Sequence, residues 1–310
     1  MAPVLWGLNF VVIDEGLGDI PPLLFLSFRF VLVAFPLIFF IPRPAIPWST
    51  LLGIGTFMSL GQFSLLYIAL DLGMPAGLAS LVLQVQVMVT ILLAWLFLGE
   101  RATPRQLAGV AVGAIGLLVV ALAHGARAPI LPLLVTIAAA TSWAIGNTIT
   151  RHAKVASGLS VVVWSALVVP VPCVLLSLVV DGPAGVQSGL ESIDAAAVAS
   201  TLYTAIGASL IGYSLFNGLL SRYPAATVVP FILLVPPVGI ASAWLLQNEV
   251  PTRLESVGAL VMMAGVATAT FGAKRPAAVA AEAADEPGAG DPAAGAVPAP
   301  ARAALGDSEA

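Results

Sequence analysis

Uncharged apolar stretches of about twenty residues follow one another along most of this chain. An α-helix needs about 20 predominantly apolar residues to cross the hydrocarbon core of a bilayer. Charged residues make up 9% of the chain, against about a quarter in soluble globular proteins, and the mean hydropathy is +1.03. The sequence therefore predicts an all-α integral membrane protein that crosses the bilayer many times.

Charged residues and helix-breaking glycines and prolines divide the apolar sequence into ten expected transmembrane helices. They are expected at about 2–13, 22–41, 48–70, 75–98, 104–123, 129–150, 158–180, 195–220, 225–247 and 252–272. The first is about half a normal crossing, so either the true start lies upstream or the bilayer thins around it. Residues 273–310 have no aromatic side chain and are rich in Ala, Pro and Gly, which predicts a disordered tail.

Basic residues fall unevenly between the loops on the two sides of the expected membrane. With a cytoplasmic N-terminus, eight of them lie inside and two outside. The inner ones are Arg43, Arg101, Arg105, Arg151, Lys154, Arg222, Lys274 and Arg275, and the outer ones are Arg127 and Arg253. The positive-inside rule therefore predicts a multi-pass inner (plasma) membrane protein with both termini, and so the tail, in the cytoplasm.

Several function classes are disfavoured by what the chain lacks. One cysteine, Cys173, and two histidines, His124 and His152, provide neither an internal disulfide nor a histidine-rich metal site. No G-x-x-x-x-G-K-[ST] phosphate loop occurs, and the net charge of −4 comes with no basic patch for nucleic acid. No expected helix carries a His/Asp/Glu cluster of catalytic spacing. We therefore expect no enzyme activity, no cofactor, no metal and no nucleic-acid partner.

An internal repeat relates the two halves of the chain. A shift of 149 positions lays Pro75 on Pro224, Ala94-Trp-Leu96 on Ala243-Trp-Leu245, Glu100 on Glu249, Gly109 on Gly258 and Gly116 on Gly265. Near the start of each half, Trp6-Gly-Leu-Asn9 resembles Trp143-Ala-Ile-Gly-Asn147, and a loop near 181–194 absorbs most of the remaining offset. Each half is then a five-helix unit, residues 1–123 and 129–272. Because five is odd, the second unit enters the membrane inverted, as in many secondary transporters.

The repeat carries a specific residue pattern. It includes Trp6-Gly-Leu-Asn-Phe-Val-Val-Ile13, Pro21-Pro22 with Arg29-Phe30, and Pro75-Ala-Gly-Leu-Ala-Ser running to Leu98-Gly-Glu-Arg101. This pattern resembles the EamA family of the drug/metabolite transporter superfamily over roughly residues 1–272. Leu83-Gln-Val-Gln86, Trp164-Ser-Ala166 and the segment 229–236 are most similar to the O-acetylserine/cysteine exporters of that family. The resemblance implies export of small amino-acid metabolites through a cavity lined by the first, third, fourth, sixth, eighth and ninth helices.

Polar and aromatic side chains at membrane depth are the candidates for substrate contact, because a polar group facing lipid is costly without a partner. On one continuous helix Gln84 and Gln86 would point about 200° apart, so we expect them on different faces. Asn9 and Asn147 occupy matching places in the two halves, which also suits a scaffold or a gate. The expected substrate-binding residues are Tyr213, Asn217, Gln84, Gln86, Tyr67, Trp143, Trp164, Asn9 and Asn147.

A second group of residues is expected to act in coupling or gating: Arg29, Glu100, Glu249, Pro236 and Pro237. Arg29 is expected either to pair with Asp14, Glu15 or a backbone carbonyl, or to meet a substrate carboxylate. The two glutamates are expected either to cap the next helix or to couple protons. The two prolines predict a bend in 225–247 that helix 75–98, with Val87-Met88 at the equivalent positions, does not share.

These observations predict a secondary transporter that exports cysteine-like or O-acetylserine-like metabolites by alternating access. Its partners are then a small-molecule substrate, the lipid bilayer and protons as a coupling ion. A broad-specificity exporter of drugs or toxins from the same superfamily is the alternative, favoured if the cavity is mainly aromatic and aliphatic. A membrane scaffold without transport is a further alternative.

Overall fold

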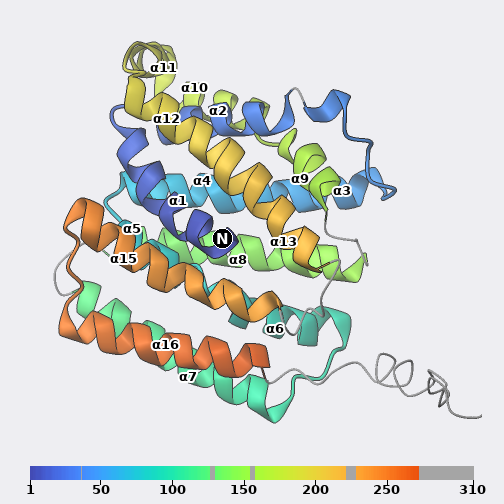
Figure 1. Cartoon of the computed structure of the whole chain (residues 1–310), viewed down its shortest axis with the longest axis vertical. Coiled ribbons are helices and arrows are strands. Elements are labelled where there is room, and N and C mark those ends of the chain that lie inside the picture. The colour runs from blue at the N-terminus through green and yellow to red at the C-terminus, as the bar shows by residue number, and fades with distance from the viewer. Residues whose placement is uncertain (36, 126–129, 154–157, 221–227, 272–310) are drawn as a thin grey trace, which may run out of the picture. The chain divides into compact units, whose positions relative to one another are not determined.

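The computed structural model describes residues 1–35, 37–125, 130–153, 158–220 and 228–271 (Figure 1). Within these ranges every regular element is a helix, which confirms the all-α prediction. Eight helical segments are long and apolar enough to cross a membrane, and Phe231–Gln247 is a shorter apolar helix. The tail expected at 273–310 and the first residues of the helix expected at 225–247 lie outside the described residues.

Several of the expected helices are divided by short interruptions or contain a π-helical segment. The elements of the first half are α1 (Ala2–Leu17), α2 (Pro22–Ala34), η1 (Leu37–Phe39), α3 (Trp48–Ile54), η2 (Gly55–Gly61), α4 (Gln62–Asp71), α5 (Ala76–Val82), α6 (Val85–Leu98) and α7 (Pro104–Gly125). Those of the second half are α8 (Leu131–His152), α9 (Leu159–Ala166), α10 (Pro170–Val180), α11 (Gly182–Glu191), α12 (Ala195–Leu202), η3 (Tyr203–Ile211), α13 (Gly212–Leu220), η4 (Val229–Leu234), α15 (Val235–Gln247) and α16 (Arg253–Phe271).

Two expected boundaries are wrong. The first helix was expected to end at Ile13, but α1 continues to Leu17 through two acidic residues. The Gln247 side-chain amide donates to both carboxylates, at 2.6 Å to Asp14 and 3.0 Å to Glu15. The region near 181–194, expected to be a loop, contains the helix α11.

The segments η2 and η3 are π-helical and lie at positions related by the 149-residue shift. Each continues an α-helix at both ends, so each is a local widening of one long helix rather than a break. Such π segments occur frequently at functional sites. In η3 the Ser209 hydroxyl donates to the Thr204 carbonyl at 2.9 Å, which satisfies a carbonyl of the widened turn.

The helices α7 and α16 pack side by side at one edge of the bundle (Figure 1). Close backbone approaches join Gly109 to Ala269, Gly113 to Gly265, and Gly116 to Met262. A Cβ added at Gly109, Gly116 or Gly265 would collide with the backbone of the other helix. Because the contacts move down one helix as they move up the other, the pair is antiparallel.

The long helices α1 and α8 each pack mainly against the opposite half of the chain. Helix α1 contacts α15, α12 and η3, whereas α8 contacts α4, η2 and α6. Gly7 allows the close contact of α1 with Val238 of α15, and Gly146 allows that of α8 with Met58 of η2. Polar side chains of α1 and α8 are thereby brought between the two halves.

Candidate functional site

A cavity of about 310 Å³ lies between α1, α8 and the interrupted helices of both halves. Its lining comes from the six helices that the resemblance implies, together with α2. The polar and aromatic residues around it are Trp6, Asn9, Phe10, Arg29, Gln62, Phe63, Ser80, Gln84, Gln86, Trp143, Asn147, Thr150, Tyr213 and Phe216. Small-molecule sites usually enclose about 300–1,000 Å³, so this cavity suits a small ligand.

The two glutamines share this cavity because the helix is interrupted beside them. Helix α5 ends at Val82 and α6 begins at Val85, and the amides of Gln84 and Gln86 bond to carbonyls three residues back. The expected separation of about 200° assumed one continuous helix, and that assumption does not hold at this interruption. No proline or glycine at 83–86 marks this tight turn in the sequence.

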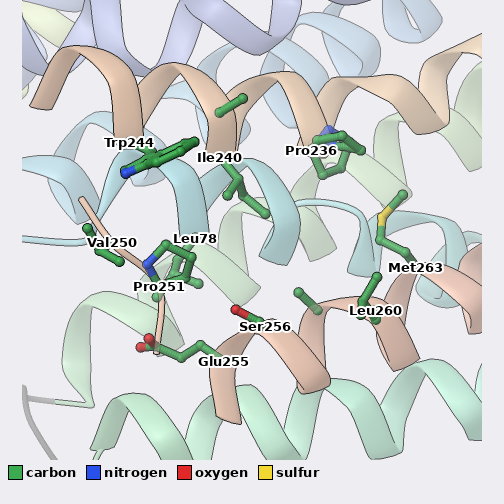
Figure 2. A pocket seen from close by; sticks show the side chains of 13 residues that line it. Leu78, Pro236, Ile240, Trp244, Val250, Pro251, Glu255, Ser256, Leu260 and Met263 are labelled. Atoms are coloured by element: carbon green, nitrogen blue, oxygen red, sulfur yellow. The ribbon is translucent and has the colours of Figure 1, made fainter. Parts of the chain in front are cut away.

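The equivalent interruption in the second half lies between η4 and α15. Helix interruptions therefore occur at equivalent places in both halves, and not only where Pro236 and Pro237 lie. Ile232 and Val235 face the cavity at this interruption, whereas Pro236 and Pro237 line a separate groove of about 490 Å³. Figure 2 shows that groove between α15 and α16, with Pro236, Ile240 and Trp244 on one side. Its lining is almost entirely apolar and contains no basic side chain, so it is poorly suited to an amino acid.

The matching asparagines have different surroundings. Asn147 donates from Nδ2 to Gln86 Oε1 at 2.8 Å, which joins α8 to α6. Asn9 is 6% exposed, and its Oδ1 is buried without a hydrogen-bond partner among the described residues. The 149-residue shift places Val235 at the position equivalent to Gln86, so the second half has no amide there to bond Asn9.

Arg29 lines the cavity and is 3% exposed. Its Nη2 donates to Ser209 Oγ at 3.0 Å, and its Cζ lies 4.2 Å from the centre of the Phe63 ring. The expected pairing with Asp14 or Glu15 is wrong, because among the described residues no ion pair joins Arg29 to either carboxylate, and both accept from Gln247 instead. Nε and Nη1 of Arg29 are buried with no hydrogen-bond partner within the described ranges.

Aromatic side chains form one wall of the cavity. The Trp6 ring lies 5.2 Å from the ring of Tyr213 and 5.4 Å from that of Phe216, between ring centres. The Trp6 Nε1 donates to the Ala208 carbonyl at 2.8 Å, which fixes the ring against η3. Trp143 also lines the cavity, as expected for a substrate-binding residue.

Two predicted aromatic residues do not line the cavity. Tyr67 is 1% exposed, packs against Phe25 and lies near Arg29 in the surrounding core. Trp164 donates from Nε1 to the Ile41 carbonyl at 3.0 Å and packs against Trp48, which gives it a role in packing. The side chain of Asn217 lies outside the described residues.

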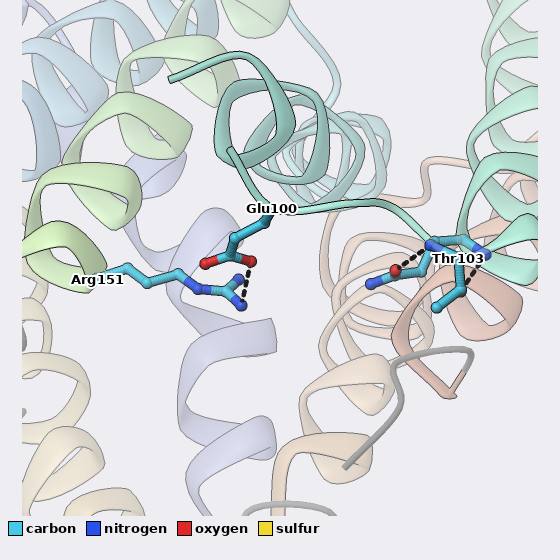
Figure 3. A network of polar contacts seen from close by, with 4 residues as sticks. Glu100, Thr103 and Arg151 are labelled. Carbon is cyan, nitrogen blue, oxygen red and sulfur yellow. Dashed lines mark hydrogen bonds and ion pairs between the residues drawn. The ribbon is translucent and has the colours of Figure 1, made fainter. Parts of the chain in front are cut away.

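The two repeat-related glutamates make different contacts, and neither caps the next helix in sequence as expected. Glu100 forms an ion pair with Arg151 of α8 at 2.7 Å (Figure 3). Glu249 accepts from the amides of Ala76 and Gly77 at 3.2 Å, so it caps α5 in the other half. Burial raises the pKa of Glu249, and these two amides oppose the rise.

The next helices are capped by residues that sequence reasoning missed. Thr103 and Gln106 bond reciprocally at the start of α7, as Figure 3 shows, and Thr252 and Glu255 do the same at the start of α16. Both pairs have the T-x-x-[EQ] spacing of a capping box, so the pattern was readable in the sequence.

Other missed residues line the cavity, as Gln62 and Phe63 do, or bond to its arginine, as Ser209 does. Gln62, 5% exposed, is an amide within an apolar stretch, and the reasoning applied to Gln84 would have found it. Phe63 and Ser209 have no such signal, because apolar rings and hydroxyls are common throughout membrane helices. Their role becomes visible only through their contacts with Arg29.

Comparisons with known proteins agree with this architecture. Residues 1–122 and 130–271 match the EamA-like transporter family. The chain belongs to this family. It is 44% identical over 275 residues to a probable amino-acid metabolite efflux pump of Escherichia coli (strain K12), covering 87% of this chain and 92% of that protein. It is 45% identical, with the same coverage, to a protein of the same name from Salmonella typhimurium.

A solved crystal structure superposes on this chain with a TM-score of 0.59 at 21% sequence identity, covering 89% of this chain and 96% of the other. At this identity the likeness shows the fold alone. Together with the long apolar helices, membership of the EamA-like family shows that the protein is a multi-pass membrane transporter of small molecules.

Proposed function

We propose that this transporter exports small amino-acid metabolites, of the size of cysteine or O-acetylserine, from the cytoplasm across the inner membrane. The observation that carries this proposal is the composition of the central cavity. It combines one buried arginine, several amides and an aromatic wall within about 310 Å³. The efflux pumps of Escherichia coli and Salmonella support the same substrate class by name and by similarity over most of the chain.

The charge of the cavity favours amino-acid metabolites over the broad drug exporter. None of the described residues that line it is Asp or Glu, whereas Arg29 supplies a positive charge. A lipophilic cation in this cavity would be repelled by Arg29, because the described lining has no carboxylate to offset the two positive charges. A zwitterionic or anionic molecule would itself provide the negative charge that pairs with Arg29.

Alternating access through two inverted five-helix repeats, residues 1–123 and 129–272, is part of the proposal. The antiparallel packing of α7 and α16 supports it, because the repeat relates these two helices to each other. The matching positions of η2 and η3, and of the interruptions before α6 and α15, also support it. The two segments matched by the family agree with two such units.

The ends of α1 and α8 are proposed to form the two gates. At one end Gln247 of α15 binds Asp14 and Glu15 of α1, and at the other Glu100, next to α6, binds Arg151 of α8. With both termini cytoplasmic, the first contact closes the outer mouth and the second the inner mouth. Breaking one contact while the other holds would expose the cavity to one side at a time.

The substrate is proposed to contact Asn9, Gln84, Gln86, Trp143, Asn147 and Tyr213, which all line the cavity.

Inside-out vesicles from overexpressing cells test the function. We expect saturable uptake of labelled cysteine or O-acetylserine, competed by few other amino acids. Uptake with and without an imposed pH gradient tests proton coupling. Absence of uptake by vesicles that contain the protein would contradict the proposed substrate class, and competition by lipophilic cations would favour the drug exporter.

A further inference from the structure

Arg29 carries a buried charge that no acidic side chain in the described part of the chain neutralises. Its guanidinium lies in the cavity wall, where the described lining has no carboxylate. The ion pair found among the described residues joins Arg151 and Glu100 elsewhere. A buried charge without a partner is strongly unfavourable. A ligand that brings a negative charge would therefore be favoured in this cavity.

The orientation of Arg29 is fixed by contacts on two sides. Ser209 donates its hydroxyl proton to the Thr204 carbonyl and so accepts from Arg29 Nη2, at 3.0 Å. The face of the guanidinium lies against the Phe63 ring. Phe30 and Tyr67 also lie beside the guanidinium. Among the described residues, the donors on Nε and Nη1 still have no hydrogen-bond partner. Arginine is thus held in place with spare hydrogen-bond donors at a ligand-sized cavity.

Two further polar atoms beside the cavity, one donor and one acceptor, have unused hydrogen-bonding capacity. Gln84 is 2% exposed, and its Nε2 is a donor that has no partner among the described residues. Asn9 Oδ1 is an acceptor that likewise has no partner in the described part of the chain. An α-amino acid offers the complementary set, because its carboxylate only accepts hydrogen bonds and its ammonium only donates them.

We propose that Arg29 is the anchor for the substrate's α-carboxylate, that Gln84 donates a further hydrogen bond to it, and that Asn9 Oδ1 accepts from the α-ammonium. This inference rests on the proposed function and specifies which groups read the amino-acid backbone. The side chain of the metabolite then lies against the remaining lining. In this arrangement the substrate itself is the counter-ion of Arg29, and a molecule without a carboxylate is rejected.

Competition by cysteine analogues tests the anchor. In wild-type inside-out vesicles, we expect unlabelled cysteine to compete with labelled cysteine far better than cysteine methyl ester, which lacks the carboxylate. Arg29→Gln should raise the KM for cysteine by about 10- to 100-fold, since hydrogen bonds to charged groups are the strong ones. It should also strengthen competition by the ester, because the repulsion between Arg29 and the ester's ammonium disappears. An unchanged preference for acid over ester in Arg29→Gln would overturn the proposal.

Thermal stability of the purified protein gives a readout that does not depend on transport. We expect cysteine to raise the melting temperature of the wild type and not that of Arg29→Gln, whose melting temperature without ligand should equal or exceed that of the wild type. Arg29→Lys should retain part of the stabilisation. Arg43→Gln is the matched control, because Arg43 stacks on Trp48 in an exposed loop outside the cavity. Equal stabilisation of wild type and Arg29→Gln by cysteine would contradict the anchor.

The two proposals fail in different ways. If the wild type transports cysteine but Arg29→Gln keeps its KM and its preference for the acid, only the anchor is wrong. If no amino acid in a full panel is transported by the wild type or raises its melting temperature, both proposals are wrong. N-acetylcysteine, which lacks the ammonium, tests Asn9 in the same way. Its poor competition against the wild type should improve relative to cysteine in Asn9→Ala.

Discussion

In the α7–α16 pair, repeat-related positions make equivalent contacts, whereas in the central cavity they carry different groups. Gly109 and its counterpart Gly258 each allow a close approach of the opposite helix, as do Gly116 and Gly265. In the cavity, by contrast, Asn147 bonds Gln86 while Asn9 has an unsatisfied oxygen, with Val235 at the position equivalent to Gln86. The α7–α16 contact thus uses repeat-related positions in the same way, whereas the polar groups that line the cavity differ between the two halves.

The difference between the α7–α16 contact and the cavity indicates how a protein built from two similar halves can form one specific binding site. Two similar halves give two equivalent frames, but one small ligand needs only one set of contacts. Repeat-related residues that make equivalent contacts in both halves hold the two halves together, and we call them the frame. Repeat-related residues whose hydrogen-bond partner is present in only one half have a polar group left in the other half that can bind the ligand. The predictions below test this division, beginning with the frame.

The largest effect is expected from the α7–α16 contact. Gly265→Ala should lower the free energy of unfolding by about 2 kcal/mol or more, because the added Cβ collides with the backbone of Gly113. Thermal unfolding followed by size-exclusion chromatography measures it. Gly207→Ala is the matched control, since its Cβ would lie no closer than 3.5 Å to Tyr203 and other atoms. Equal stability of the two variants would show that the glycine contact is not part of the frame.

The asparagine pair should separate stability from transport. Asn147→Ala removes the 2.8 Å bond to Gln86 and should lower the free energy of unfolding by about 1 kcal/mol. Asn9→Ala removes no hydrogen bond from Oδ1 and should leave stability nearly unchanged while raising the KM for cysteine by about tenfold. Melting temperatures and vesicle uptake of both variants measure the two effects. The reverse result, a raised KM in Asn147→Ala and lower stability in Asn9→Ala, would show that Asn147 rather than Asn9 has the free group that meets the substrate.

The tryptophan pair tests which aromatic residues face the substrate. Trp143→Phe should raise the KM for cysteine by a few-fold, because Trp143 lines the cavity. Trp164→Phe should leave KM unchanged and lower the free energy of unfolding by about 1 kcal/mol, through loss of the bond to the Ile41 carbonyl. Uptake kinetics and melting curves separate the two. A raised KM in Trp164→Phe alone would place the substrate outside the cavity described.

The smallest effect is expected at Glu249, which joins the halves by a contact that its counterpart Glu100 does not make. Burial raises its pKa above the ordinary 4.5, although the Gly77 and Ala76 amides oppose the rise. The folded state therefore holds this proton more tightly than the unfolded state. The stabilisation from the raised pKa is present below the ordinary value and is lost as pH rises through the folded pKa. Wild type should thus lose stability relative to Glu249→Gln as the pH rises from the ordinary carboxyl pKa through the raised pKa of the folded state.

A constant difference in melting temperature between wild type and Glu249→Gln across that range would contradict the raised pKa. Glu100→Gln serves as the control for removal of a repeat-related carboxylate that lies in a different contact.

Much of the helical fold could be predicted from the sequence because the length of apolar stretches has a direct physical meaning in a membrane. The repeat-related glycines Gly109 and Gly258, and Gly116 and Gly265, lie at the close contact of α7 with α16, but the sequence analysis used them only as evidence for the repeat. The interruption at Gln84 could not be predicted, since a tight turn stabilised by its surroundings needs no proline. The helix α11 was missed because Gly182-Pro183 is typical of a loop as well as of a helix start.

Residue type indicated the cavity only in part. Amides and tryptophans at membrane depth were sound candidates, and Asn9, Gln84, Gln86, Trp143, Asn147 and Tyr213 do line one cavity. Tyr67 and Trp164 have the same chemistry but pack elsewhere, because composition does not specify which face of a helix points inward. The surroundings of Arg29 depend on Ser209, about 180 residues away in sequence, and no local pattern encodes that contact.

The most direct test of the account is equilibrium binding of labelled O-acetylserine to purified wild-type protein, with Arg29→Gln measured in parallel. The account predicts one saturable site per chain, competed by cysteine but not by lipophilic cations, and binding at least about tenfold weaker in Arg29→Gln. Binding of equal strength in both proteins, or displacement of O-acetylserine by lipophilic cations, would contradict the central claim that this cavity recognises the amino-acid backbone.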